Sequence, residues 1–286
     1  MVLGTAVTVS RFAYLADASG IMVTLFRGIF MVLVLGVGLK LSRYRWPLPK
    51  RLVPLAMLNG LLMAIMTYGN IGAVEFISIG LAALLFFTFP IMLAILVMVF
   101  RLEEVKPIKL LSIAVAFIGL AIVLGVSLGS VDWRGPALSL SAAAATALNA
   151  VIFARYFKEV NVFVTTFHFS VYALLSLGLI ALFMTYTSIG EVRFPLTLSG
   201  WLGALGVGVL QGIGTPMYLY AILKIGALKT SVVTNIQPLT SVTEAWVIFD
   251  EVLNVFQAMG GGLVLAAIAI MQWADLKQAP DNHSKK

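Results

Sequence analysis

Three ionisable side chains, Glu244, Arg27 and His168, stand alone inside long apolar stretches of this 286-residue chain. An ionisable group at the centre of a membrane helix costs about 2.5–3.5 kcal/mol even on the mildest scale, and such residues often serve proton or substrate pathways. Because burial favours the protonated form of a carboxylate, Glu244 could take up and release a proton. A structural ion pair, or a position at the outer mouth of a helix bundle, would also explain Glu244.

The two basic residues of this group offer different chemistry. Arg27 carries a planar guanidinium with five donors, which suits a substrate carboxylate, although an ion pair with Glu244 or a helix-end carbonyl would also satisfy it. His168 could titrate near neutral pH, while a hydrogen bond between helices is the simpler explanation. We therefore predict Glu244 and His168 as proton-coupling residues and Arg27 as a substrate-binding residue. Arg11 is expected near the cytoplasmic end of its segment, with its charge reaching the membrane interface.

Uncharged polar side chains recur within the apolar stretches and could complete a binding site. A cavity for an amphipathic metabolite needs mostly apolar walls with a few placed donors and acceptors. Hydrogen bonds between helices remain the alternative for each of these side chains taken alone. The residues predicted to bind substrate together with Arg27 are Tyr68, Asn70, Gln211, Tyr218 and Asn235.

Pro90 and Pro238 lie within two of the apolar stretches. A proline inside a helix removes a hydrogen bond and kinks the helix, so the freed carbonyls could contact a substrate and the kink could move. We predict both prolines as hinges, with a static kink as the alternative.

The elements that must position these side chains are transmembrane helices. Hydrophobic residues make up 61% of the chain and charged residues 11%, whereas a soluble domain carries about 45–50% apolar and about 25% charged residues. A helix that crosses a bilayer needs about 20 predominantly apolar residues, and such runs recur along almost the whole sequence. The predicted spans are Val2–Ala16, Ile21–Leu39, Leu52–Val74, Phe76–Phe100, Ile108–Leu128, Pro136–Phe157, Val162–Tyr186, Leu198–Leu223, Ile225–Phe249 and Val255–Trp273.

The distribution of basic residues predicts the orientation of these spans, because short cytoplasmic loops collect Lys and Arg. With a cytoplasmic N-terminus, 15 of the 19 Lys and Arg residues fall on the cytoplasmic side, Arg134 and Arg193 fall outside, and Arg11 and Arg27 lie within spans. We therefore expect a multi-pass protein of the cell (inner) membrane with both termini in the cytoplasm.

The composition and motifs argue against several other functions. The formal charge of +7 is spread between apolar runs and forms no basic stripe, which argues against nucleic-acid binding. Cysteine is absent, and the sequence holds no HExxH, no Ser–His–Asp arrangement and no cluster with metal-ligand spacing. We therefore predict that the protein is not an enzyme and uses no metal and no cofactor. The expected partners are a small-molecule substrate and the lipid bilayer, and both a monomer and a homodimer remain open.

The chain repeats itself in outline. Pro90 and Glu103 in the first half match Pro238 and Glu251 in the second, each pair 148 residues apart. Since each half holds five predicted spans, an odd number, the two copies must lie inverted in the membrane, as in many secondary transporters. The predicted fold class is therefore all-α integral membrane, with ten transmembrane helices as two inverted five-helix repeats over residues 1–128 and 133–275 and a disordered cytoplasmic tail over 276–286.

A series of short motifs occurs in the same order in both halves. The residues are Ala73–Ser78, Pro90 and Arg101–Glu104 in the first half, and Ala221–Gly226, Pro238 and Phe249–Glu251 in the second. This order of an A-x-x-x-x-(S/G) pattern, a proline and an acid at a helix end resembles the EamA type of the drug/metabolite transporter superfamily. Arg27 matches the arginine that this family carries in the second helix of a repeat. The resemblance implies two five-helix repeats and export, or sometimes uptake, of amino acids and similar small metabolites.

The residues and the resemblance together predict a secondary transporter of amino acids or related small metabolites. We expect efflux by alternating access, with proton coupling through Glu244 left open. An uncoupled facilitator or exchanger of the same substrates is the first alternative. A channel or a membrane protein without transport activity is a more distant one.

Overall fold

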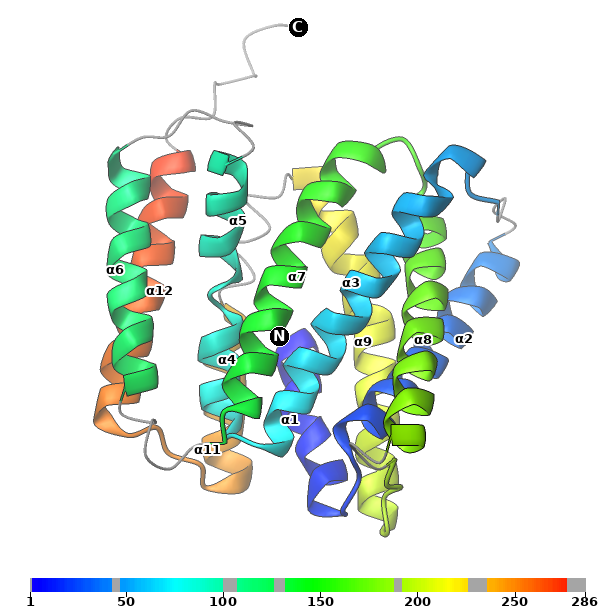
Figure 1. Cartoon of the computed structure of the whole chain (residues 1–286), viewed down its shortest axis with the longest axis horizontal. Helices are drawn as coiled ribbons and strands as arrows, with labels where there is room; N and C mark the ends of the chain where they lie inside the picture. Colours follow the sequence, from blue (N-terminus) through cyan, green and yellow to red (C-terminus); the bar gives the residue numbers. More distant parts are fainter. Residues whose placement is uncertain are drawn as a thin grey trace, which may run out of the picture.

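The computed structural model describes residues 2–42, 47–99, 107–125, 132–187, 192–225 and 236–276. Within these ranges the chain is helical and contains no strand (Figure 1). The helices of the first half are α1 (Val2–Leu15), α2 (Gly20–Leu41), η1 (Lys50–Leu52), α3 (Val53–Gly72), η2 (Ala73–Glu75), α4 (Ile79–Phe86), α5 (Phe89–Val99) and α6 (Pro107–Gly125). Those of the second half are α7 (Arg134–Tyr156), α8 (Val162–Thr187), α9 (Leu198–Ile225), α11 (Ile236–Phe249) and α12 (Val255–Leu276).

Within the described ranges, six helical segments are long and apolar enough to cross a bilayer. They are Gly20–Leu41, Lys50–Glu75, Ile79–Leu96, Arg134–Tyr156, Val162–Thr187 and Leu198–Ala221. The large apolar side chains Leu179, Leu182 and Phe183 of α8 are each more than half exposed, as expected of a helix that faces lipid. The fold is therefore that of an integral membrane protein, and the count of ten spans stays a prediction.

The predicted span Phe76–Phe100 corresponds to the segment Ile79–Leu96, which is interrupted, because α4 and α5 are separate helices within it. The break lies at Thr88, whose hydroxyl donates a hydrogen bond to the carbonyl of Leu85 at 2.7 Å. Pro90 is the second residue of α5. Proline has no N–H to donate and is tolerated in the first turn of a helix, so the chain starts a new helix there. Pro238 likewise lies in the first turn of α11.

Helices that are distant in the sequence pack side by side. α3 packs on α7 and α8, α9 packs on α1 and α2, and α2 packs on α8, while α6 and α12 form a pair at one side of the molecule (Figure 1). The same contacts are recovered when α1, α2, α3 and α6 are exchanged for α7, α8, α9 and α12. Two copies of one unit would give this pattern, and the division into repeats over 1–128 and 133–275 stays a prediction.

Two glycines of α3 let this helix approach its neighbours closely. A Cβ atom on Gly60 would lie 2.3 Å from the Cβ of Tyr172 in α8, and one on Gly69 would lie 2.4 Å from the carbonyl oxygen of Leu138 in α7. Small residues at such contacts let membrane helices associate through close van der Waals packing. α3 is therefore held tightly between α7 and α8.

The two ends of the bundle are distinguished by their loops. In Figure 1 the chain turns at the lower end after α1, α3 and α8, and at the upper end after α2 and α7. The N-terminal end of α1 lies at mid-height rather than at the upper end (Figure 1). With the orientation predicted from the basic residues, the lower end of the bundle faces away from the cytoplasm. This assignment stays a prediction.

Candidate functional site

A small cavity lies among helices from both halves of the chain. Its volume is about 80 Å³, and residues of α2, α3, α4, α5, α7, α8, α9 and α11 form its wall. Most of these side chains are apolar, with a few polar groups between them, as in sites that bind small molecules.

The predicted binding residues divide among three places. Asn70, Gln211 and Tyr218 line the cavity together with Arg27. Tyr68 lines a second, larger cavity instead. Asn235 lies outside the described residues.

Helical spacing explains which residues reach the cavity. Positions separated by three or four residues lie on one face of a helix, whereas each single step turns the side chain by about 100°. Tyr68 lies one residue after Thr67 and two before Asn70, which turns it away from the middle of the face that lines the cavity. The lining residues of α3 are Met63, Met66, Thr67, Asn70 and Ile71, and those of α9 are Gln211, Thr215, Tyr218 and Leu219.

Arg27 is the charged side chain of this cavity. It is 3% exposed, and its Nη2 donates a hydrogen bond to Oε1 of Gln211 at 3.2 Å. The hydroxyl of Thr215 donates to the same oxygen at 3.4 Å. Nε of Arg27 has no hydrogen-bond partner. Among the described residues Arg27 forms no ion pair with Glu244, and its charge meets only neutral partners at the cavity.

Five further polar residues line the cavity but were not predicted as binding residues: Thr67, Thr146, Asn149, Thr215 and Gln237. The hydroxyl of Thr67 donates to a backbone carbonyl of its own helix at 2.6 Å, and that of Thr146 does so at 2.7 Å, which leaves their oxygens as acceptors. The amide of Asn149 donates to the backbone of α3 at 3.3 Å. The signal that could have found Thr67 is its position three residues before Asn70, on the same face of α3.

Aromatic side chains complete the wall where α4 ends and α5 begins. Phe86 and Phe89 both line the cavity, with their ring centroids 5.7 Å apart, and Phe169 of α8 joins them. The break at Thr88 therefore lies beside the cavity. A change of angle between α4 and α5 would move two lining residues at once.

The predicted proton-coupling residues are absent from the lining of the described cavities. Oε1 of Glu244 accepts a hydrogen bond from the hydroxyl of Thr5 at 2.7 Å, across the contact between α1 and α11, and Oε2 is buried without a hydrogen-bond partner. Nδ1 of His168 lies 2.8 Å from the carbonyl oxygen of Val164, one turn earlier in α8. Within the described part of the chain, no three His, Asp or Glu side chains gather to hold a metal ion.

A larger cavity of about 1080 Å³, here called the vestibule, lies at the lower ends of α2, α3, α7 and α8. The same four helices continue into the wall of the smaller cavity. Ile21 of α2 lines the vestibule, and Arg27 lies six residues further along, roughly 9 Å deeper at the rise of an α-helix. The vestibule therefore lies between the small cavity and the lower end of the bundle.

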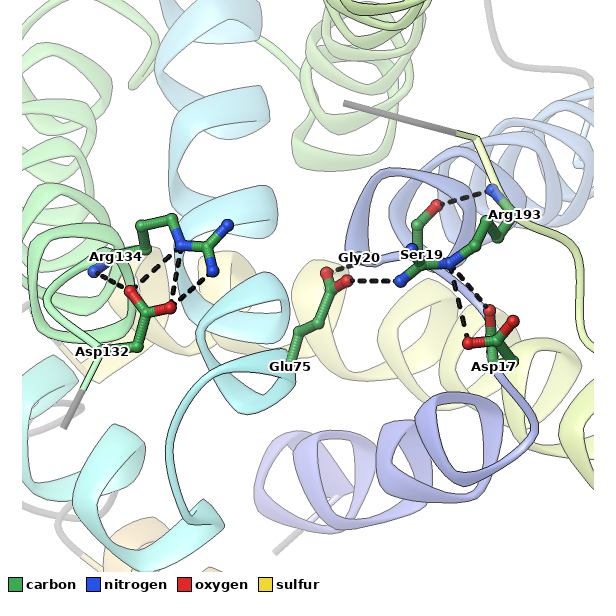
Figure 2. A network of polar contacts seen from close by, with 7 residues as sticks. All are labelled: Asp17, Ser19, Gly20, Glu75, Asp132, Arg134 and Arg193. Carbon is green, nitrogen blue, oxygen red and sulfur yellow. Dashed lines mark hydrogen bonds and ion pairs between the residues drawn. The ribbon is translucent and has the colours of Figure 1, made fainter. Parts of the chain in front are cut away.

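Charged side chains join loops of the two halves beside the vestibule (Figure 2). Nη2 of Arg193 donates to Oε1 of Glu75 at 3.3 Å, and its Nε lies 3.7 Å from Oδ1 of Asp17. Oε2 of Glu75 accepts from the backbone N–H of Gly20 at 2.8 Å, at the N-terminus of α2. The backbone of Arg193 also exchanges hydrogen bonds with Ser19, at 3.1 Å in each direction. The loop after α1 is thus tied to the loop after α8.

A second ion pair lies at the N-terminus of α7. Nε of Arg134 donates to both carboxylate oxygens of Asp132, at 3.0 Å and 2.9 Å (Figure 2). These hydrogen bonds lower the pKa of Asp132 below its ordinary value. The Arg134 guanidinium also lies 4.3 Å from the ring centroid of Phe76. This pair is exposed and acts on the rim of the vestibule rather than in the small cavity.

Arg11 lies in the second half of α1, and its expected place at the cytoplasmic end stays a prediction. Its Nη1 donates to the carbonyl of Val74 at 2.7 Å, and its Nη2 lies 3.5 Å from Oε1 of Glu251. Oε2 of Glu251 accepts from the N–H of Ile79 at 2.9 Å. Glu251 therefore satisfies the first turn of α4 from the other half of the chain, as a carboxylate at a helix N-terminus does.

Comparisons with known proteins relate this chain to a protein family and to a solved structure. The EamA-like transporter family matches residues 133–273. A solved crystal structure is similar over 95% of this chain and 96% of its own length, with a TM-score of 0.64 and 17% sequence identity, which shows a shared fold alone. No curated protein sequence matches the chain.

Proposed function

Because the chain belongs to the EamA-like transporter family, which matches residues 133–273, we propose that it is a secondary transporter of small metabolites with its substrate site in the small cavity. The observation that carries the proposal is a cavity walled by helices of both halves, with the buried Arg27 in its wall. Secondary transporters hold their substrate in such a place, between the halves and near the midplane.

The proposed mechanism is alternating access, in which the halves rock about the cavity and expose it to each side in turn. The vestibule and the small cavity share α2, α3, α7 and α8. This favours a conformation in which the small cavity is closer to opening at the lower end than at the upper end. The charge asymmetry of the sequence makes this side the outer one. Substrate therefore leaves the cell through the vestibule.

Glu244 is the proposed proton carrier. Its Oε1 is hydrogen-bonded to Thr5 and its Oε2 has no partner, so a proton can be added at Oε2 without breaking the existing bond. The contact between α1 and α11, where this bond lies, joins the two halves of the chain. Protonation there would change how the halves hold together. An uncoupled facilitator or exchanger is the alternative.

The test is counterflow of labelled metabolites (amino acids, other carboxylates, nucleosides and sugars) into proteoliposomes, with and without a pH gradient. The proposal expects saturable exchange of one class, driven by the gradient in the wild type and not in Glu244→Gln. Asp132→Asn, at the exposed rim of the vestibule, is the matched control and should keep the drive. Exchange that does not depend on the pH gradient would indicate an uncoupled facilitator or exchanger. Flux that neither saturates nor responds to a competing substrate would indicate a channel.

A further inference from the structure

Resting on the proposed function, we infer that the small cavity selects a monoanion, a small carboxylate with an apolar or neutral polar body, over a zwitterion or a cation. The inference depends on one juxtaposition. A buried guanidinium stands in the wall, and the other polar groups around it are uncharged. This favours related carboxylates over the amino acids that the family resemblance implies, because amino acids are zwitterions at neutral pH.

Arg27 is placed to hold an anion. A guanidinium stays protonated in proteins, so this side chain brings a full positive charge to a site where it is 3% exposed. Its hydrogen bond goes to the neutral amide of Gln211, and its Nε is unpaired. A carboxylate can accept two parallel N–H···O bonds from one edge of a guanidinium, which a neutral acceptor matches poorly.

Within the described part of the chain, no acidic side chain in the cavity wall balances the charge of Arg27. No Asp or Glu is among the described lining residues. The segment 226–235, which joins α9 to α11, contains Lys229 and no acidic residue. A bound monoanion brings the site to neutrality, a zwitterion leaves one positive charge, and a cation leaves two. Because an unpaired charge in an apolar interior is costly, neutrality favours the monoanion.

The remaining side chains of the cavity wall indicate the chemistry of the uncharged part of the ligand. Met63, Phe86 and Phe169 offer apolar surface, while Asn70 and Gln237 bring neutral amides to the wall. Neutral amides can bind hydroxyl or carbonyl groups of a substrate. They accept hydrogen bonds from an ammonium group as well, but they do not cancel its charge.

The test is binding by isothermal titration calorimetry to the purified full-length protein in detergent. The ligands share one branched apolar body: 4-methylpentanoate, its uncharged amide, the zwitterion leucine and the cation 3-methylbutylamine, in which the ammonium group replaces the carboxylate. 3-Phenylpropanoate with its amide, phenylalanine and 2-phenylethylamine forms a second series with an aromatic body. In at least one series, the carboxylate should bind at least about tenfold more tightly than the other three members.

Variants locate the effect. Arg27→Gln should remove the advantage of the carboxylate, and Arg27→Lys, which keeps the charge without the planar fork, should retain part of it. Arg193→Gln, in the vestibule network, is the matched control and should leave the affinities unchanged. If a variant at Arg27 fails to fold, the affinities of the wild-type protein for the four members of each series still test the inference.

The inference is overturned if the amide, leucine or the amine binds as tightly as the carboxylate, if Arg27→Gln keeps the preference, or if folded protein binds no member of either series. Counterflow separates this from the proposed function. Transport of an uncharged or zwitterionic compound would support the transporter function and contradict the preference for a monoanion. Selective binding of the carboxylate without any counterflow would support that preference and contradict the transporter function.

Discussion

At the scale of single residues, the contact between Arg27 and Gln211 sets the electrostatics of the cavity. The amide oxygen of Gln211 holds the guanidinium at 3.2 Å and carries no charge. Hydrogen bonds to charged groups are worth about 1.5–3 kcal/mol, but a neutral partner leaves the charge itself uncompensated. The protein therefore accepts a cost in the empty state that a bound anion relieves.

Replacing this partner with an acid tests the argument. In Gln211→Glu the new carboxylate should pair with Arg27, stabilise the protein by about 1–3 kcal/mol in thermal unfolding, and weaken 4-methylpentanoate binding by at least about tenfold. Gln211→Leu removes the partner and should lower the stability instead. A Gln211→Glu protein that is less stable than the wild type and binds the carboxylate normally would contradict this account.

The sequence identifies the residue types of the site better than their directions. Arg27, Asn70, Gln211 and Tyr218 stand out as polar groups in apolar helices, and the structure gathers them in one cavity. Tyr68 stands out in the same way but points to the vestibule. The face of α3 that meets the cavity cannot be read from hydrophobicity, because its lipid-facing, packed and cavity-lining faces are all largely apolar.

At the scale of elements, close helix contacts hold the walls of the cavity. Gly60 lets α3 approach α8, whereas Gly178 of α8 has no atom within 4 Å of the place that a Cβ would take. The two glycines therefore form a matched pair, one at a tight contact and one in open space.

Alanine at these two positions should act in opposite directions. Gly60→Ala forces Cβ against Tyr172 and should destabilise the protein by about 1–3 kcal/mol, as overpacking does. Gly178→Ala should be neutral or stabilise by up to about 1 kcal/mol, because alanine favours the helix. Thermal unfolding in one detergent compares them. Equal effects of the two substitutions would show that α3 and α8 are not packed as described.

The break between α4 and α5 is the second element that shapes the site. Pro90→Ala restores an N–H in the first turn of α5 and allows the two helices to join. The joined helix should slow counterflow several-fold with little loss of stability, because Phe86 and Phe89 can no longer shift relative to one another. Pro136→Ala, in the first turn of α7, is the control and should leave counterflow unchanged. Normal counterflow by Pro90→Ala would rule out a hinge at this position.

The break also shows what the sequence leaves open. The run from Phe76 to Phe100 is continuously apolar, which predicts one span, and the proline predicts a kink. Whether a proline kinks a helix or ends it depends on the neighbours that accept the freed backbone groups. Here Thr88 bonds to Leu85 and closes the end of α4, which is a local contact that composition does not reveal.

At the scale of the whole molecule, the cavity and the vestibule lie in series along the bundle and share four helices. Contacts between helices repeat when the two halves are exchanged, as α3 with α7 and α9 with α1. The hydrophobic runs and the order of the motifs predict this arrangement in outline. The central claim is that the small cavity opens to both sides of the membrane in turn.

Cysteine accessibility tests that claim most directly, because the chain contains no cysteine of its own. Ala150→Cys places one thiol in the cavity wall, Ser141→Cys places one in the vestibule, and Leu182→Cys, at a side chain that is 69% exposed to lipid, is the control. Each variant is treated with a membrane-impermeant thiol reagent from either side of oriented vesicles. We predict modification of Ala150→Cys from both sides, of Ser141→Cys from the outer side alone, and of Leu182→Cys from neither. Modification of Ala150→Cys from one side only, or from neither side in folded protein, would contradict alternating access through this cavity.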